Sequence, residues 1–137
     1  MVNIWAILIS MILSVVLGFV WYGPLFGKKW MALSGISMPN PKPGFSVMLK
    51  PIIISFVGAL LMSYVLTYVI AFHNGFYQTS GYLTAILMGV FLWAGFIVPV
   101  YLNFLGWEGR PKALFFINSG YWLVFIILSS AIINAFM

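Results

Sequence analysis

Four long stretches of the chain carry no charged residue, and they restrict the fold more than any other feature of the sequence. They cover residues 2–22, 51–72, 82–104 and 113–136. A helix rises about 1.5 Å per residue, so about 20 apolar residues cross a hydrocarbon layer of about 30 Å. The stretches lack the alternation of apolar and polar residues that marks the strands of a membrane barrel. We therefore predict an all-α integral membrane bundle of four transmembrane helices that forms a single domain.

The composition excludes a water-soluble domain. Only 5% of the 137 residues are charged, whereas about 25% of the residues of a soluble domain are charged. The chain has no cysteine, one histidine and one acidic residue. A zinc site takes three or four ligands, and carboxylate catalysis generally takes a pair of acids. We therefore expect no metal, no cofactor and no enzymatic activity.

The basic residues predict how the helices are oriented. All six lie in two of the connections between the apolar stretches, at Lys28, Lys29, Lys42, Lys50, Arg110 and Lys112. Cytoplasmic loops of membrane proteins carry such an excess of lysine and arginine. This predicts a cytoplasmic loop at 23–50, an N-terminus and a C-terminus outside, and a multi-pass protein of the inner (plasma) membrane. The lipid bilayer, and not nucleic acid, is then the partner that explains the net charge of +5.

Small residues recur every four positions in the first two apolar stretches. They are Ser10, Ser14 and Gly18 in the first, and Ser55, Ala59, Ser63 and Thr67 in the second. Residues four positions apart share one face of a helix, and small faces let membrane helices approach closely. We interpret both sets as helix-packing faces. The alternative is that one of them lines a water-filled path.

The third apolar stretch predicts a helix kink at Gly95 and Pro99. Proline has no N–H group, so Pro99 cannot donate to the carbonyl of Gly95 four residues earlier. An unpaired carbonyl in hydrocarbon costs several kcal/mol, and we expect a side chain to satisfy it. The candidate donors are Ser55, Asn103 and Asn118. The alternative is an ordinary proline kink repaired by water or a nearby hydroxyl.

Polar and aromatic side chains gather in the predicted cytoplasmic half of the helices. The candidate ligand-binding residues are Tyr22, Ser55, Trp93, Asn103, Asn118, Tyr121 and Trp122. Polar groups inside a membrane often mark functional sites, which favours a polar cavity with aromatic walls that opens to the cytoplasm. A purely structural layer of hydrogen bonds is the alternative.

The one acidic residue, Glu108, lies two positions before Arg110. Such neighbours usually form an exposed ion pair that contributes little to stability. Glu108 is a candidate functional acid only if its connection folds back over the mouth of the bundle.

Several segments resemble a known family. They are residues 3–6 (NIWA), 18–30 (GFVWYGPLFGKKW), 93–96 (WAGF) with Pro99, and 118–121 (NSGY). In these segments the chain resembles the uncharacterised bacterial family called domain of unknown function 1761. The resemblance covers nearly the whole chain apart from a proline-rich linker and the outer loop. It implies a small four-span membrane protein and leaves the activity open.

Three classes of function remain. The first is a non-enzymatic membrane protein that binds or passes a small neutral, weakly anionic or lipid-like solute through the cavity. The second is a structural or accessory subunit that docks another membrane protein. The third is an enzyme acting on lipid or quinone through Tyr22, Tyr121, Asn118 and Glu108. Self-association into a homo-oligomer is compatible with each of them.

Overall fold

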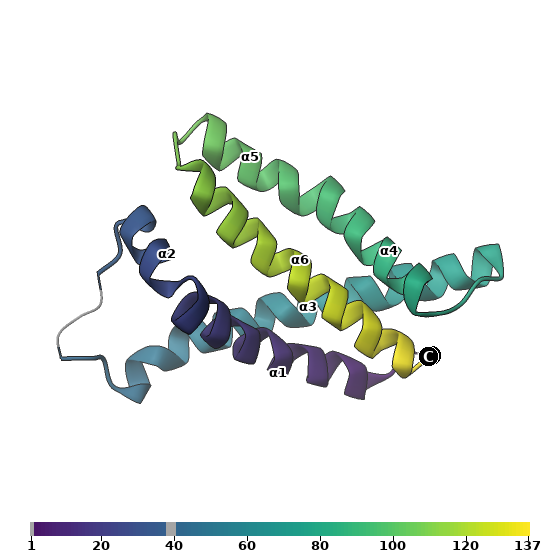
Figure 1. Ribbon diagram of the computed structural model, residues 1–137. Coiled ribbons are helices and arrows are strands. Elements are labelled where there is room, and N and C mark those ends of the chain that lie inside the picture. The colour runs from purple at the N-terminus through teal and green to yellow at the C-terminus, as the bar shows by residue number, and fades with distance from the viewer. Residues whose placement is uncertain (1, 38–40) are drawn as a thin grey trace.

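The computed structural model describes residues 2–37 and 41–137, and it consists of helices joined by short connections (Figure 1). The described residues contain no strand. They form four helical spans long and apolar enough to cross a membrane: Ile4–Leu25, Phe45–Tyr77, Tyr82–Gly106 and Lys112–Ala135. The prediction of an all-α protein with four membrane-spanning helices is confirmed.

The first span combines an α-helix with a π-helix. The α-helix α1 (Ile4–Val20) begins after Asn3, whose side chain accepts a hydrogen bond from the backbone N–H of Trp5 at 3.0 Å. The π-helix η1 (Trp21–Leu25) continues it. The chain then turns into a short helix, α2 (Gly27–Ser34), which ends at Gly35 in the left-handed conformation that glycine favours. The predicted loop at 23–50 therefore contains a helix, and residues 38–40 of that loop lie outside the described residues.

The second span, α3 (Phe45–Tyr77), extends beyond the predicted 51–72 at both ends. Its 33 residues are about 50 Å long at helical rise, more than the hydrocarbon layer requires. The prediction began after Lys50 because a charged residue is not expected in hydrocarbon. A helix can, however, continue past the layer into the headgroup region, where Lys50 remains hydrated. Pro51 is tolerated near the start of α3, and the hydroxyl of Ser55 donates to its carbonyl at 2.9 Å.

The third span changes helix type in the middle. It consists of α4 (Tyr82–Leu92), the π-helix η2 (Trp93–Ile97) and α5 (Val98–Gly106), with Pro99 in the first turn of α5. The fourth span is the continuous helix α6 (Lys112–Ala135). Irregular helix geometry thus lies where the sequence predicts a kink.

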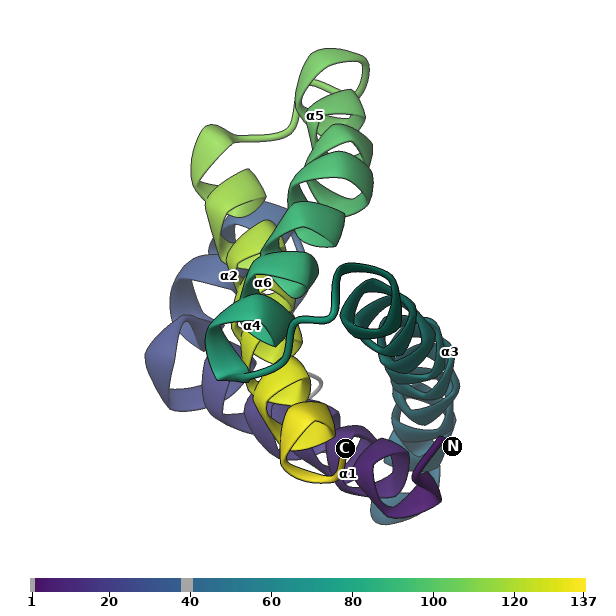
Figure 2. The ribbon, with the colours of Figure 1, turned by 90° about the vertical axis from the view of Figure 1, so that its right-hand side faces the viewer.

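Helix α6 is the central element of the bundle. It contacts α1, α2, α3, α4 and α5. Figure 2 shows it in the middle of the molecule, with α2 and α3 on opposite sides of it. The fully buried side chains include Phe125 and Ile133 of α6, Ile7 of α1 and Ile70 of α3. The core is therefore organised around the last span.

Small residues lie where the helices pack. Ser10, Ser14, Ala59, Ser63 and Thr67 are all buried, in agreement with the packing interpretation, whereas Ser55 is exposed. In the third span, a Cβ atom added to Gly89 would collide with the side chains of Ser130 and Ile126. These small side chains are what allows the helices to approach so closely.

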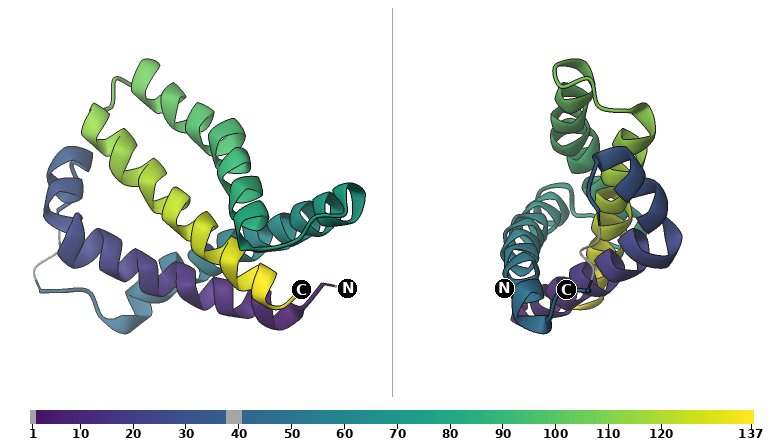
Figure 3. Two further views of the ribbon diagram at one scale, coloured as in Figure 1. Left: turned by 45° about the vertical axis from the view of Figure 1, so that its right-hand side comes forward. Right: turned by 90° about the vertical axis from the view of Figure 1, so that its left-hand side faces the viewer.

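The two ends of the bundle differ in charge. The start of α1 and the end of α6 lie at one end (Figure 3). Helix α2, the start of α3 and the connection from α5 to α6, which together with the residues next to them carry the basic residues, lie at the opposite end, which we call the basic end (Figure 1). That the basic end faces the cytoplasm, and the termini the outside, stays a prediction of the charge distribution.

Candidate functional site

Two tryptophans tie the other spans to the backbone of α6. The indole Nε1 of Trp21 donates to the carbonyl of Ile117 at 2.9 Å, and the Nε1 of Trp93 donates to the carbonyl of Ser119 at 2.8 Å. Both acceptors lie inside a helix, so each indole adds a hydrogen bond to a carbonyl that already faces the N–H four residues later. The partly buried indoles thereby have the hydrogen-bond partners that polar groups need inside a membrane.

Each of these tryptophans opens a π-helix. The carbonyl of Trp21 accepts the N–H of Phe26, and that of Trp93 accepts the N–H of Val98, five residues later in both cases. A proline that lacks an N–H lies near each π-helix: Pro24 within η1 and Pro99 just after η2. A π-helix inserts one residue into a turn and changes the direction of the side chains around it, and such insertions are frequent at functional sites.

Three further hydrogen bonds join the same part of α6 to its neighbours. The hydroxyl of Tyr121 donates to the carbonyl of Ser14 at 2.7 Å, and the hydroxyl of Tyr22 donates to Oδ1 of Asn118 at 2.8 Å. The indole of Trp122 donates to the hydroxyl of Tyr101 at 3.0 Å. We call these five bonds the α6 layer, formed by Trp21, Tyr22, Trp93, Tyr121 and Trp122 as donors and by Ile117, Asn118, Ser119, Ser14 and Tyr101 as acceptors.

Five of the seven candidate residues meet in the α6 layer, namely Tyr22, Trp93, Asn118, Tyr121 and Trp122. Ser55 and Asn103 do not meet them. Both are exposed, and each donates to the carbonyl four residues earlier on its own helix: Ser55 to Pro51 at 2.9 Å and Asn103 to Pro99 at 3.2 Å. Neither therefore supplies the donor that was expected for the carbonyl of Gly95.

Sequence reasoning missed Trp21 and Tyr101, and it predicts an interfacial segment, not a pocket wall, where α2 lies. A signal for Trp21 was present, because Trp21 and Trp93 share the pattern of a tryptophan two residues before a glycine, with a proline close behind. The ring of Trp21 also packs closely against Gly120, where an added Cβ would lie 3.3 Å from the indole. The sequence around Tyr101 contains no comparable pattern, so it does not show whether this side chain faces the other helices or the lipid.

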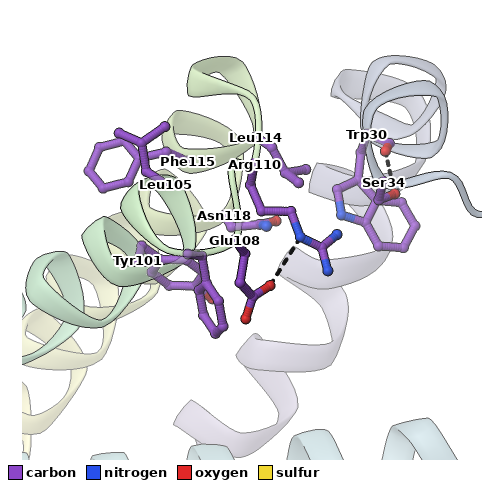
Figure 4. A pocket seen from close by; sticks show the side chains of 10 residues that line it. Trp30, Ser34, Tyr101, Leu105, Glu108, Arg110, Leu114, Phe115 and Asn118 are labelled. Carbon is purple, nitrogen blue, oxygen red and sulfur yellow. Dashed lines mark hydrogen bonds and ion pairs between the residues drawn. The ribbon is translucent and has the colours of Figure 1, made fainter.

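A pocket of about 250 Å³ lies next to the α6 layer, on the side of the basic end. Helix α2, helix α5, the connection after α5 and the start of α6 enclose it (Figure 4). The lining residues are Trp30, Ser34, Tyr101, Phe104, Leu105, Glu108, Arg110, Leu114, Phe115 and Asn118. Along α6, Asn118 is the lining residue farthest from the basic end, six positions after Lys112 or about 9 Å at helical rise.

Glu108 lies in the wall of this pocket. Its Oε2 atom accepts a hydrogen bond from Nε of Arg110 at 3.2 Å, and both side chains are about half exposed, at 47% and 48%. The ion pair expected from the sequence is thus present. The sequence made Glu108 a candidate functional acid only if its connection folds back over the end of the bundle. The connection does so, because the side chains of Glu108 and Arg110 both line the pocket (Figure 4).

A second pocket is lined by apolar side chains alone. It has a volume of about 500 Å³ and lies between α3 and the third span. All of its lining side chains are apolar: Leu61, Met62, Val65, Leu66, Val69, Leu92, Phe96, Ile97 and Ile126. It presents no hydrogen-bonding side chain that could orient a ligand, so the pocket at the basic end is the candidate site. In the described residues, no group of three or more His, Cys, Asp or Glu side chains is placed to hold a metal ion.

The fold and the pocket define the class of protein: a multi-pass membrane protein with a polar, aromatic-walled pocket at one end of a helical bundle. The chain belongs to the family described as protein of unknown function DUF1761, whose model matches residues 5–134. This confirms the resemblance seen in the sequence. No curated protein and no solved structure gives a significant match. The family is one of unknown function, so the argument for function rests on the pocket.

Proposed function

We propose that this protein is a non-enzymatic component of the inner (plasma) membrane that binds a small neutral or amphiphilic molecule in the pocket at its cytoplasmic end. The observation that carries the proposal is the environment of Asn118. Its Oδ1 accepts from Tyr22, its Nδ2 makes no hydrogen bond to the described residues, and the residue lines the pocket. A polar group left available in a pocket that also has apolar and aromatic walls is typical of a ligand site.

Binding is better supported than passage. Directly beyond Asn118, the α6 layer ties α6 to the first span through Trp21 and to the third span through Trp93. The rings of Tyr22 and Tyr121 fill the space beside them, with centroids 5.5 Å apart. A solute moving across the membrane would have to break these contacts, whereas a solute that only binds would leave them intact.

A role without catalysis is supported by the acid–base groups of the pocket. Glu108 is its one carboxylate, and this carboxylate is paired with Arg110. General acid–base chemistry on a lipid or quinone generally needs a second group to return the proton. The remaining polar groups of the pocket are hydroxyl, amide and indole groups, which are suited to hydrogen bonding.

The absence of cysteine from the natural chain allows a direct test. Ser34→Cys places a single thiol in the pocket wall, and Ser46→Cys places one on the exposed start of α3. Both variants are reconstituted in nanodiscs of phosphatidylcholine and alkylated with a neutral maleimide. The probes are dodecyl phosphate, dodecyl maltoside and dodecyltrimethylammonium.

We expect at least one of the three probes to slow alkylation at position 34 severalfold and to leave position 46 unchanged. If none of the probes protects position 34, or if both positions are slowed equally, the binding function is refuted. An accessory subunit that docks another membrane protein would then become the better proposal.

A further inference from the structure

We infer that the pocket selects a molecule with an anionic head, a carboxylate or a phosphate, attached to an apolar body. This inference rests on the proposed binding function and names the class of ligand. It follows from a count of the hydrogen-bonding groups that the pocket leaves unused. That count is unbalanced, since donors outnumber free acceptors.

The innermost free donors come from Asn118 and Tyr101. Because Oδ1 of Asn118 already accepts from Tyr22, the group it can offer to a ligand is the Nδ2 amide. The oxygen of Tyr101 accepts from the indole of Trp122, and its own O–H donates to none of the described residues. Each residue therefore presents a proton to the pocket that an acceptor on the ligand would satisfy.

The outer donors come from Trp30 and Arg110. The indole N–H of Trp30 donates to no acceptor among the described residues, although the ring lines the pocket. Only Nε of Arg110 is engaged by Glu108, so the two terminal nitrogens of the guanidinium remain. Figure 4 shows the side chains of Trp30, Arg110 and Asn118 arranged around the same pocket. A guanidinium with a free edge matches the paired oxygens of a carboxylate or a phosphate.

The acceptors are fewer. Ser34 uses its proton to donate to the carbonyl of Trp30, so its oxygen can only accept from a ligand. The Oε2 atom of Glu108 accepts from Nε of Arg110, and its Oε1 remains a free acceptor. An anionic head on the two terminal nitrogens of Arg110 would lie beside this carboxylate. We therefore assign Glu108 the role of an internal counter-ion that competes with the ligand for Arg110.

The surrounding charge favours the same ligand. Helix α2, which supplies Trp30 and Ser34, also carries Lys28 and Lys29, and Lys112 begins α6. With Arg110, which lines the pocket, the elements that form its walls carry four cations, whereas Glu108 is the one carboxylate among the lining residues. Opposite charge concentrates an anion near such a mouth and raises its rate of entry.

The remaining walls are apolar and fit the body of the molecule. They come from Phe104, Leu105, Leu114 and Phe115. The volume of about 250 Å³ is below the roughly 300–1,000 Å³ of sites that enclose a drug-sized ligand. The pocket therefore holds the head and a short apolar segment, and the rest of a longer chain extends toward the bilayer.

The thiol-protection assay with Ser34→Cys tests the head group. We expect dodecyl phosphate to protect position 34 at a concentration at least about tenfold lower than either dodecyl maltoside or dodecyltrimethylammonium. Equal protection by all three probes, or stronger protection by the cationic probe, refutes the anionic ligand and leaves the binding function standing. Protection by none refutes the binding function itself.

Two further arms identify the source of the anion. Inorganic phosphate is added alone, and separately the phosphatidylcholine of the nanodiscs is replaced by phosphatidylglycerol. Protection by inorganic phosphate indicates a free anion. Protection by dodecyl phosphate and by phosphatidylglycerol, but not by inorganic phosphate, indicates a lipid head group. Both results support the shared anion chemistry.

Charge variants test the counter-ion. Glu108→Gln removes the competing carboxylate, so it should lower the dodecyl phosphate concentration required for protection by severalfold. Arg110→Gln should raise that concentration about tenfold or more, because it removes the principal cation. Lys42→Gln is the matched control, since it removes the same charge from the exposed connection between α2 and α3. If Lys42→Gln changes protection as much as Arg110→Gln does, the effect belongs to the membrane surface and the assignment fails.

Discussion

The hydroxyl of Tyr22 and the side-chain oxygen of Asn118 are 2.8 Å apart, although 96 positions separate the two residues in the sequence. This hydrogen bond joins the end of the first span to the fourth span at the inner edge of the pocket. It also leaves the Nδ2 of Asn118, a residue that lines the pocket, without a hydrogen bond to the described residues. Stability and the proposed binding therefore depend on the same pair of side chains.

Breaking this pair should reduce stability by a measurable amount. Tyr22→Phe retains the ring but loses the hydroxyl, and we expect it to lower the free energy of unfolding by about 1 kcal/mol. Asn118→Leu should have an effect at least as large. A double-mutant cycle, measured by unfolding in mixed detergent micelles, should give a positive coupling energy between the two residues. Asn134→Leu, near the end of α6 that is opposite the basic end, is the control with little effect, and equal effects at 118 and 134 would contradict the prediction.

The indole hydrogen bonds to α6 should contribute similarly. Trp21→Phe and Trp93→Phe each remove a donor from a main-chain carbonyl, and we expect each to cost at least about 1 kcal/mol of unfolding free energy. Trp107→Phe is the matched control, because that ring is 90% exposed. A loss of stability at Trp107 as large as at Trp21 would mean that the hydrogen bonds are not the cause.

Gly89 and Gly95 of the third span should respond differently to an added methyl group. At Gly89 a Cβ atom would overlap the side chains of Ser130 and Ile126, whereas the space around Gly95 is open within 4 Å. We expect Gly89→Ala to destabilise the protein by about 1–3 kcal/mol. Gly95→Ala should change stability by no more than about 0.5 kcal/mol. Thermal unfolding of the two variants in the same detergent measures the difference, and a reversed order would exclude the close approach of α4 and α6.

Gly27 should control the wall of the pocket. A Cβ atom there would lie 2.5 Å from the backbone carbonyl oxygen of Tyr22, so an alanine must push α2 away. Because α2 carries Ser34, Gly27→Ala in the Ser34→Cys background should speed alkylation of the thiol and abolish protection by dodecyl phosphate. Gly23→Ala, at a position with open space around it, should behave like the parent protein. Unchanged alkylation and protection in Gly27→Ala would show that α2 does not depend on this contact.

The orientation is tested by labelling from one side of the membrane. A cysteine at Pro41, beside Lys42, should react with a membrane-impermeant thiol reagent only when the cytoplasmic face is open to it. A cysteine at Thr79, in the connection from α3 to α4, should react from outside in intact cells. The opposite labelling pattern would mean that the orientation is the reverse of the predicted one and that the pocket lies on the outer face of the membrane.

The sequence determined the number and type of spans because a charge in hydrocarbon is costly enough to delimit each helix. It located the α6 layer in part, because depth in the membrane follows from position along a helix. Depth alone does not show which way a side chain faces around the helix. Ser55 and Asn103 lie at a suitable depth and point away from the layer, whereas Tyr101 points toward the pocket. Facing directions depend on packing between spans and on the two π-helices, for which no local rule exists.

Helix α2 was the other element that sequence reasoning could not place. Its eight residues carry Lys28 and Lys29 next to Trp30, a pattern that predicts contact with the membrane interface. Its role as a pocket wall depends on the sharp turn at Gly27, which brings the chain back against Tyr22. That contact joins residues only five positions apart, but a pocket wall forms only where α2 also packs against α6.

The main-chain acceptors of α6 have a consequence for how the family can evolve. The oxygens that receive Trp21 and Trp93 belong to the peptide groups of Ile117 and Ser119, and every amino acid supplies the same oxygen. These two hydrogen bonds therefore place no constraint on the side chains at positions 117 and 119, whereas they require the indoles of Trp21 and Trp93. Contact inference from alignments depends on correlated substitution between two contacting residues. It would therefore find no signal for these two hydrogen bonds.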